Sequence, residues 1–297
     1  MNIMISGGTG LLGTALTQSL LADGHKVFVL SRGNSTRSDI QIVKWDAQTT
    51  DGWGHLVNEI DVVIHLAGRS TASWPWTAAR KKSFEDSRIL SGLALAQAIR
   101  GATRRPSLFV QVSGINYYGL HGDLADESTP PGDDFLAQLT VKWENATKSV
   151  EELGVRRLVL RTPPVLAREN VILKLIALPV QLFVGGTLGS GKQPFPWIHI
   201  KDWVGAVRYL MANENAHGAY NLIAPSQTTL SEFTRQLAKI LHRPYWFPVP
   251  AFLMRNVLGE MSVLILDGRF SQPKRLIESG YAFQFPGPHE ALTDLFE

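Results

Sequence analysis

The chain has 297 residues, of which 44% are hydrophobic and 19% charged, and its formal net charge is +3. This composition is typical of a globular protein with enough residues for a large core, and the small, scattered positive charge argues against a nucleic-acid-binding protein. The sequence has no cysteine and eight histidines, which excludes disulfides, thiolate catalysis and cysteine zinc sites, and because the histidines show no metal-ligand spacing we expect no metal site.

The first predicted unit is a strand, a tight turn and a helix. An apolar strand ends at Ile5, and after the turn apolar residues recur at helical spacing. The turn contains the pattern Gly7-x-x-Gly10-x-x-Gly13, a variant of the dinucleotide-binding fingerprint, in which glycines allow a sharp turn and the helix N-terminus favours a pyrophosphate. A glycine turn without a ligand is the alternative. The residues expected to bind the dinucleotide are Gly7, Thr9, Gly10, Leu11, Leu12 and Gly13.

The second predicted strand, Lys26 to Leu30, ends at Ser31 and Arg32. An acidic residue at this place suits the ribose 2′-hydroxyl of NAD, whereas a cation and a hydroxyl suit the 2′-phosphate of NADP. Arg37 follows closely, and the first acidic residue is Asp39. The sequence therefore predicts NADP(H) as the cofactor, with a solvated arginine on a surface loop as the alternative.

The rest of the first half alternates between buried strands and helices. The predicted elements are strands at Ile42–Asp46, Asp61–Gly68 (closing on a glycine turn), Leu108–Ser113 and Arg157–Arg161 and helices at Thr77–Ala102 and Asp134–Leu153. This alternation predicts an α/β fold with a doubly wound parallel (Rossmann) sheet and ligands at the carboxyl ends of the strands. Leu66, Ala67 and Gly68 would lie along the cofactor. Asp46 would meet the adenine amino group or be a surface aspartate, and His65 is expected in the core.

These motifs resemble the extended short-chain dehydrogenase/reductase superfamily, and within it the NAD(P)-dependent epimerase/dehydratase family. The matching residues are the Gly7-to-Gly13 turn, His65-Leu66-Ala67-Gly68, Ser113, Tyr118-Gly119, Glu127 before Pro130-Pro131, and Trp197 to Asp202. Within this family the chain resembles most specifically the sugar-nucleotide-epimerase-like subgroup, which carries a small extra C-terminal domain. The segments that match the subgroup are Asp86-Ser87-Arg88, Gly185 to Gln193, Trp197-Ile198-His199 and Pro273-Lys274-Arg275.

The resemblance implies a catalytic serine or threonine after the fifth strand and a Tyr-x-x-x-Lys pair on the next helix, where the tyrosine moves a proton. Ser113 fits the first position, but Leu139 and Trp143 stand at the tyrosine and lysine positions. Both lie on the apolar stripe of the predicted helix, and neither exchanges protons. The usual mechanism is therefore not predicted for this chain.

Tyr117 and Tyr118 are the phenols nearest to Ser113 in the sequence. We treat Ser113, Tyr117 and Tyr118 as the candidate catalytic residues, with substrate stacking or simple packing as the alternative for the two tyrosines. Glu127 and Glu144 are weaker candidates, better explained as structural carboxylates.

The resemblance also suggests that Arg88 and Arg161 face phosphate, with structural ion pairs as the alternative. The glycine-rich loop from Gly185 to Gln193 either cradles a diphosphate or wraps the mouth of the cleft. Past Pro244 the chain is rich in proline and large apolar residues, and Phe252 to Leu258 are expected to form a helix that packs into the core, a subunit contact being the alternative.

We expect residues 1–165, with 200–225 returning to them, to form the NADP-binding Rossmann domain. Residues 166–199 and 226–297 would form a smaller substrate or cap region, with a small C-terminal domain from about residue 245. The chain begins without a secretory signal and has no apolar run long enough to span a bilayer, which predicts a cytoplasmic protein.

The predicted function is an NADP(H)-dependent oxidoreductase or epimerase-like enzyme. Its substrate would be a carbonyl or alcohol compound, with a nucleotide sugar as one candidate. The alternative is a catalytically inactive NADP(H)-binding sensor or interaction protein. We expect a small-molecule substrate as partner and neither nucleic acid nor membrane, and a homodimer is one candidate for the assembly.

Overall fold

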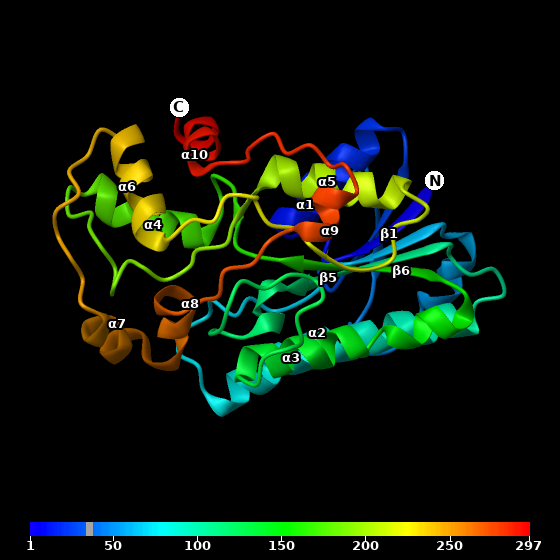
Figure 1. Cartoon of the computed structure of the whole chain (residues 1–297). Helices are drawn as coiled ribbons and strands as arrows, with labels where there is room; N and C mark the ends of the chain where they lie inside the picture. Colours follow the sequence, from blue (N-terminus) through cyan, green and yellow to red (C-terminus); the bar gives the residue numbers. More distant parts are fainter. Residues whose placement is uncertain (34–37) are drawn as a thin grey trace.

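The structure is a computed structural model in which residues 1–33 and 38–297 are described, so the predicted Arg37 lies outside the described residues. Its centre is a sheet of seven strands in the order β3-β2-β1-β4-β5-β6-β9, with parallel neighbours throughout (Figure 1). The strand order reverses at β1, which lies between β2 and β4, as in doubly wound sheets. The predicted Rossmann α/β fold is thus confirmed. The strands are β1 (Asn2–Ser6), β2 (Lys26–Ser31), β3 (Gln41–Lys44), β4 (Val62–His65), β5 (Leu108–Gly114), β6 (Arg156–Thr162) and β9 (Gly218–Asn221).

Helices cover both faces of this sheet (Figure 1). On one face lie α1 (Leu11–Ala22) and α5 (Ile200–Ala212), and on the other α2 (Ala78–Gly101) and α3 (Phe135–Asn145). Short 3-10 helices connect the elements, namely η1 (Gly54–Glu59), η2 (Ile115–Tyr118), η3 (Lys148–Leu153) and η4 (Gly259–Ser262).

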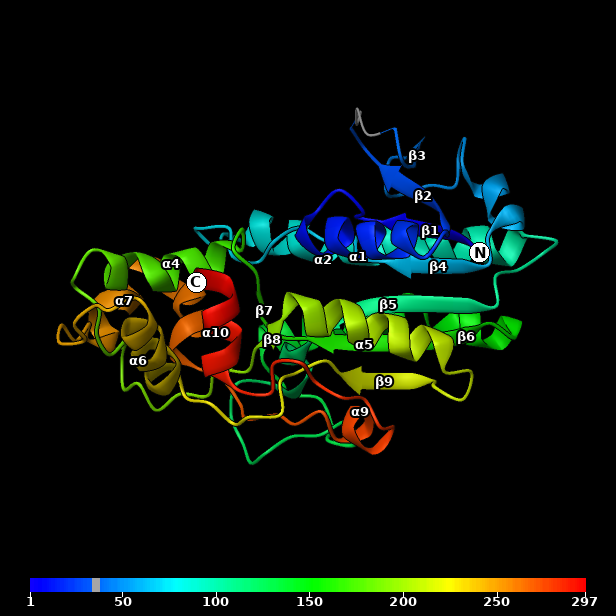
Figure 2. The same cartoon turned by 90° about the horizontal axis from the view of Figure 1, so that it is seen from above.

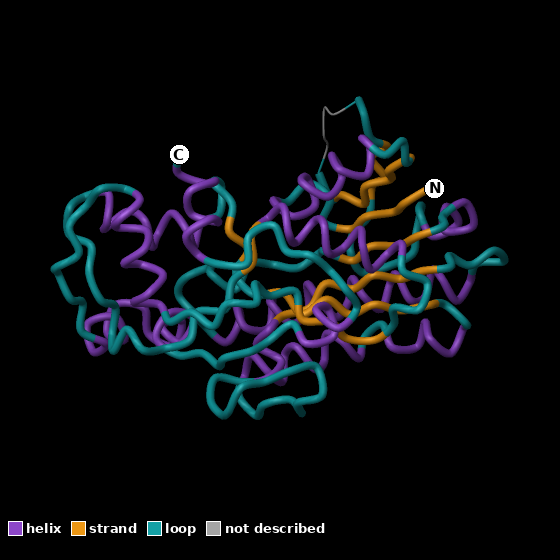
Figure 3. The backbone as a smooth tube through the Cα atoms, turned by 45° about the horizontal axis from the view of Figure 1, so that its top comes forward, coloured by secondary structure: helices purple, strands orange, loops and turns teal. Residues whose placement is uncertain are grey.

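A second, mainly helical lobe lies beyond the carboxyl ends of the strands, at the left in Figures 2 and 3. It contains α4 (Val171–Gln181), α6 (Leu230–Ile240), α7 (Ala251–Leu258), α8 (Val263–Leu266) and α10 (Pro288–Phe296). A two-stranded pair, β7 (Val165–Leu166) and β8 (Ile198–His199), joins the lobe to the sheet, and α9 (Lys274–Glu278) returns to the β9 edge. Among the described residues, no helix is both long and apolar enough to cross a bilayer.

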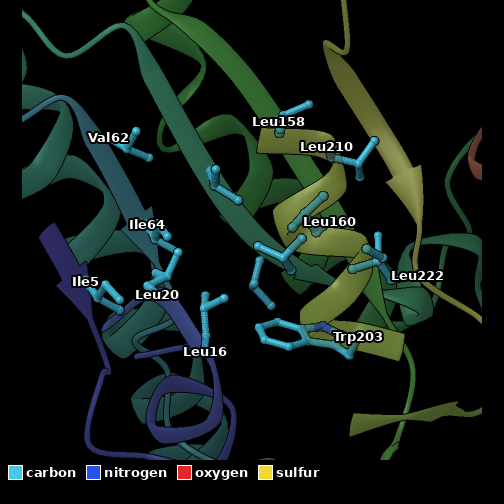
Figure 4. Close-up of a cluster of buried hydrophobic side chains, with 14 of the residues drawn as sticks. Ile5, Leu16, Leu20, Val62, Ile64, Leu158, Leu160, Trp203, Leu210 and Leu222 are labelled. Carbon is cyan, nitrogen blue, oxygen red and sulfur yellow. The ribbon is translucent and has the colours of Figure 1, made fainter. Parts of the chain in front are cut away.

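The hydrophobic core between the sheet and helices α1 and α5 holds the two halves of the sheet together. Figure 4 shows Leu16 and Leu20 of α1 and Trp203 of α5 directed toward strand residues such as Ile64 and Leu160. All five side chains are at most 1% exposed. Burial of each aliphatic side chain contributes about 1.5–3 kcal/mol, so this layer fixes the strand ends that carry the site.

The predicted helix from Asp134 to Leu153 is in fact two elements, α3 and η3. The carbonyl oxygen of Trp143 accepts a hydrogen bond from Gln111 Nε2 (2.7 Å), and that of Glu144 accepts one from Arg157. Long side chains from β5 and β6 thus bond the carbonyls at the end of α3. The periodic apolar pattern does not reveal these cross-chain partners.

The expectation that the helix after Pro250 packs into the core is wrong. No residue of α7 is buried, and Phe252 and Val257 are 62% and 67% exposed. The remaining prediction for this segment is the subunit contact.

Candidate functional site

The glycine turn brings three pieces of backbone into close contact. A Cβ atom on Gly13 would lie 2.3 Å from the carbonyl oxygen of Gly7 and 2.5 Å from the Cα of Gly8. Gly7 has a φ of 75°, and a Cβ there would lie 2.9 Å from the backbone nitrogen of Ala67. Only glycine therefore lets α1 and the loop after β4 approach the turn this closely.

Helix α1 begins at this turn without a cap. Its N-cap residue, Gly10, has no side chain that could accept from the first N–H groups, and the first turn contains no acidic residue. The exposed N–H groups and the positive end of the helix dipole are thus free to bind an anion.

A cavity of about 400 Å³ extends from this turn to the tip of β2. Its wall includes Gly7, Thr9, Ser31, Arg32 and Ala67, so the structure brings together residues that the sequence predicts for two parts of one cofactor. The predicted Asp46 does not line this cavity. Its carboxylate accepts hydrogen bonds from the backbone of Thr49 and Gln48, which hold its pKa below the usual value.

A second cavity of about 300 Å³ lies at the carboxyl ends of β5 and β6, between α3 and the lobe. Its polar wall residues include Ser113, Asn116, Thr140, Asp267 and Arg269. Leu139 and Trp143, at the positions of the expected tyrosine and lysine, also line it. This volume is at the lower end of the range of small-molecule sites.

Ser113 is fixed from behind by a buried ion pair. Its Oγ donates to Glu144 Oε1 (2.7 Å), and the same carboxylate accepts from Nε and Nη2 of Arg161, both at 3.0 Å. The side chains of Arg161 and Glu144 are only 6% and 12% exposed. Burial disfavours the charged guanidinium, but the hydrogen bonds and charge of Glu144 outweigh it and raise the pKa of Arg161.

The two candidate tyrosines lie behind this pair and line neither cavity. The Tyr118 hydroxyl donates to Asn221 Oδ1 (2.8 Å) and accepts from Arg161 Nη1 (2.9 Å). Burial raises the pKa of Tyr118 to about 12. The ring of Tyr117 packs against the Arg161 guanidinium, 3.4 Å from ring centroid to Cζ.

Of the two predicted phosphate-facing arginines, only Arg88 reaches a cavity wall. Its Nη1 donates to the carbonyl oxygens of Arg69 (2.8 Å) and Phe84 (3.1 Å), and its Cζ lies 4.9 Å from the ring centroid of Trp143. Burial lowers its pKa to about 10. A Cβ on Gly68 would lie 3.3 Å from this side chain, so Gly68 supports Arg88 directly. Arg161 is held by Glu144 instead.

Two histidines singled out by the sequence are buried structural groups. His65 lies 2.8 Å from Ser6 Oγ through Nδ1, and burial lowers its pKa to about 4. His199 Nδ1 accepts from the backbone of Lys201 and caps α5, while its Nε2 lies 3.3 Å from Asp294 Oδ2. Burial lowers its pKa to about 4 as well.

The loop from Gly185 to Gln193 packs against the lobe. A Cβ on Gly186 would lie 2.0 Å from the carbonyl oxygen of Phe247, and Gln193 Nε2 donates to the carbonyls of Leu188 (2.9 Å) and Ile265 (3.2 Å). These contacts favour a structural role over a diphosphate cradle.

Sequence reasoning missed Asp267 and Arg269 as cavity residues. Arg269 donates to the carbonyl oxygens of Asp123 (2.6 Å) and Tyr118 (2.9 Å), which brings the segment after α8 against η2. No local motif marks this long-range contact. Within the described part of the chain, no three acidic or histidine side chains are grouped as a metal site would require.

Comparison with known proteins gives two family matches. A model described as the NAD dependent epimerase/dehydratase family matches residues 3–222. A model described as a domain of unknown function, DUF1731, matches residues 249–295.

Relatives match nearly the whole chain. The epimerase family protein YfhF of Bacillus subtilis is 34% identical over 99% of this chain and 98% of its own length. The epimerase family protein SDR39U1 of Bos taurus is 36% identical over 99% of both chains. The crystal structure of human epimerase family protein SDR39U1 (isoform 2) with NADPH is 33% identical, covers 99% of both chains and has a TM-score of 0.89. UDP-N-acetylglucosamine 4-epimerase from Bacillus cereus, 17% identical with a TM-score of 0.79, shares the fold.

Proposed function

Because the chain belongs to the NAD dependent epimerase/dehydratase family, we propose that it binds NADP(H) and acts as an oxidoreductase or epimerase-like enzyme on an alcohol or carbonyl substrate. The observation that carries the proposal is the uncapped N-terminus of α1, which shares one cavity with Ser31 and Arg32. The related human protein crystallised with NADPH supports the same cofactor.

The residues of this chain fit such a dinucleotide. The turn from Gly7 to Gly13, with Leu11 and Leu12 opening α1, offers backbone N–H groups to the pyrophosphate. Arg32 and Ser31 offer a cation and a hydroxyl to the 2′-phosphate. Leu66, Ala67 and Gly68 continue toward the second cavity. When bound, the nicotinamide supplies hydride transfer.

Ser113 is the residue that we assign to contact with the substrate. Its single proton is donated to Glu144, so its oxygen presents lone pairs to the cavity and accepts a hydrogen bond from a ligand hydroxyl. Glu144 and Arg161 fix this orientation. We assign Tyr117 and Tyr118 to holding Arg161 in place, because their placement does not favour direct proton transfer.

The first test measures cofactor choice by fluorescence titration with NADPH and NADH. Arg32→Ala is expected to weaken NADPH binding by about 10-fold to 100-fold, the loss of one to two charge-assisted hydrogen bonds, and to change NADH binding little. Arg100→Ala is the matched control, since Arg100 is an exposed arginine at the far end of α2. Tighter binding of NADH than of NADPH by the unmodified protein would overturn the cofactor assignment.

A second function, NADP(H) sensing without turnover, is favoured by a specific observation. The cavity wall carries Leu139 and Trp143 at the positions where the superfamily resemblance implies a Tyr-x-x-x-Lys pair, and neither Tyr117 nor Tyr118 lines this cavity. A screen of nucleotide sugars, aldehydes and ketones that follows NADPH absorbance separates the two functions. Tight NADPH binding without turnover on any of these substrates would favour the sensor.

A further inference from the structure

Asp267 is the only acidic side chain among the described residues that line the second cavity. Most of the wall around it is apolar and includes Leu136, Leu139 and Leu264. Asp267 is half-buried, and within residues 1–33 and 38–297 no group donates a hydrogen bond to its carboxylate and no cation pairs with it. A carboxylate beside apolar groups is stabilised by a donor that reaches it. A ligand that enters the cavity can supply this donor.

The backbone around Asp267 is held from two sides. A Cβ atom on Gly268 would lie 2.8 Å from the carbonyl oxygen of Pro194, so these two segments are in close contact. The Arg269 guanidinium donates to the carbonyl oxygen of Tyr118 (2.9 Å), which fixes the segment against η2. Because this backbone is fixed before a ligand arrives, binding at Asp267 needs little further ordering of the chain.

The charged groups of the wall do not form a phosphate site. Arg88 and Arg269 are its two cationic side chains among the described residues, and each donates to two backbone carbonyl oxygens at distances of 2.6 to 3.1 Å. The two helices that begin beside the cavity are capped, since Asp134 accepts from the first N–H groups of α3 and Asn170 from those of α4. A diphosphate needs free cations or free N–H groups at a helix N-terminus, and the carboxylate of Asp267 repels it. The first cavity differs, because the N-terminus of α1 is uncapped.

The size of the cavity also favours a compact ligand. Its volume of about 300 Å³ is at the lower end of the range of about 300–1,000 Å³ for small-molecule sites. Under the proposed function, the substrate shares this space with the reactive end of the cofactor. The base, the sugars and the diphosphate of a nucleotide sugar would therefore lie mostly outside the cavity.

We propose that the second cavity binds a compact, mainly apolar alcohol, or the carbonyl compound formed from it, with a hydrogen-bond donor at the end away from the reacting oxygen. Ser113 contacts the reacting end, and Asp267 accepts from the donor at the other end. A second hydroxyl or an ammonium group supplies this donor, and nucleotide sugars are rejected. The inference rests on the proposed function, which takes this cavity as the substrate site.

The test measures binding by ligand-observed NMR, so it does not depend on turnover. The NADPH-saturated protein is titrated with linear alkanols from propanol to hexanol, with the diols and amino alcohols of the same chain lengths, and with UDP-glucose. At the best chain length we expect the diol or the amino alcohol to bind about 10-fold more tightly than the alkanol, because its second group adds a charge-assisted hydrogen bond. The better of the two series identifies the donor as a hydroxyl or an ammonium. UDP-glucose should bind more weakly than either.

Two variants locate the donor contact. Asp267→Leu should remove the preference over alkanols in both series, and Asp267→Asn, which keeps an acceptor oxygen but not the charge, should remove most of it for amino alcohols. Both variants should fold normally, because the Asp267 carboxylate has no partner among the described residues, and thermal unfolding checks this. Asp51→Asn is the matched control, since Asp51 is exposed and lines neither cavity. It should leave every affinity unchanged.

The outcomes separate this inference from the proposed function. Failure of NADPH to bind contradicts the proposed function, and the same titrations are then made on the free protein, which has the same cavity. Equal binding of alkanols, diols and amino alcohols at every chain length would overturn the inference, as would no binding of any of them. So would a donor preference that persists in Asp267→Leu, or tighter binding of UDP-glucose than of the compact probes.

Discussion

The ion pair behind Ser113 offers a quantitative test of how the site is held. Glu144→Gln keeps the shape of the side chain but removes the charge that faces Arg161, whose side chain is only 6% exposed. At an effective dielectric constant of 20, two charges about 4 Å apart interact by about 4 kcal/mol. Removing one partner of a buried pair costs about 3–5 kcal/mol. Because glutamine still offers an acceptor oxygen, we expect Glu144→Gln to lower the free energy of unfolding by about 3 kcal/mol.

A double-mutant cycle isolates the interaction. Arg161→Gln alone should also cost about 3 kcal/mol, and the double variant about the same rather than twice as much, since no unpaired charge remains buried. The assay is urea unfolding at pH 7 followed by far-ultraviolet circular dichroism. Glu85→Gln is the control, since the Lys142–Glu85 pair is 55% and 33% exposed and should contribute less than about 1 kcal/mol. A coupling energy below about 0.5 kcal/mol between Glu144 and Arg161 would refute our account of how Ser113 is oriented.

Three further predictions follow from the site. Gly13→Ala should weaken NADPH binding by roughly 10-fold to 100-fold, because its Cβ would lie 2.3 Å from a backbone oxygen and overpacking costs about 1–3 kcal/mol. Gly101→Ala is the control, since its new Cβ would meet nothing within 4 Å. Equal NADPH affinity in the two variants would contradict this prediction. His65 has a folded pKa of about 4 against an unfolded value of 6.5, so its stabilising effect is complete above pH 6.5 and lost as the pH falls toward 4. His65→Gln should therefore reduce the loss of unfolding free energy between pH 7 and pH 5 by about 2 kcal/mol, and an unchanged slope would argue against a buried neutral ring. For any substrate found, Ser113→Ala should lower kcat/KM by about 100-fold, while a comparable loss of kcat in Tyr118→Phe, with no loss of stability, would return the proton transfer to Tyr118.

The residues of the proposed cofactor site could be predicted from the sequence because they lie close together along the chain. Gly7 to Gly13 lie on one continuous turn, and Arg32 follows directly from the end of β2. The same holds for Ser113 at the end of β5. Backbone geometry and a short motif are sufficient to place such residues.

The second cavity, which is the proposed substrate site, depends on contacts between distant residues. Glu144 reaches Ser113 across 31 residues, and Asn221 reaches Tyr118 across 103. The family resemblance suggested Arg161 as a phosphate ligand, with a structural ion pair as the alternative. The structure shows the ion pair, and its partner Glu144 could not be identified until the sheet and α3 were assembled. For the same reason the apolar residues of α7 gave no sign of their exposure.

The order in which the chain supplies its sheet has a consequence for synthesis on the ribosome. Strand β9 and helix α5 come after α4, so a nascent chain that has emerged only to β7 presents β6 as an open edge and α1 without its neighbour on the same face. Open edges of this kind pair readily with other chains. Of the lobe helices only α4 precedes β9, so the sheet gains its last strand before α6, α7, α8 and α10 have been made. The vulnerable interval of the β6 edge lasts until Asn221 has emerged.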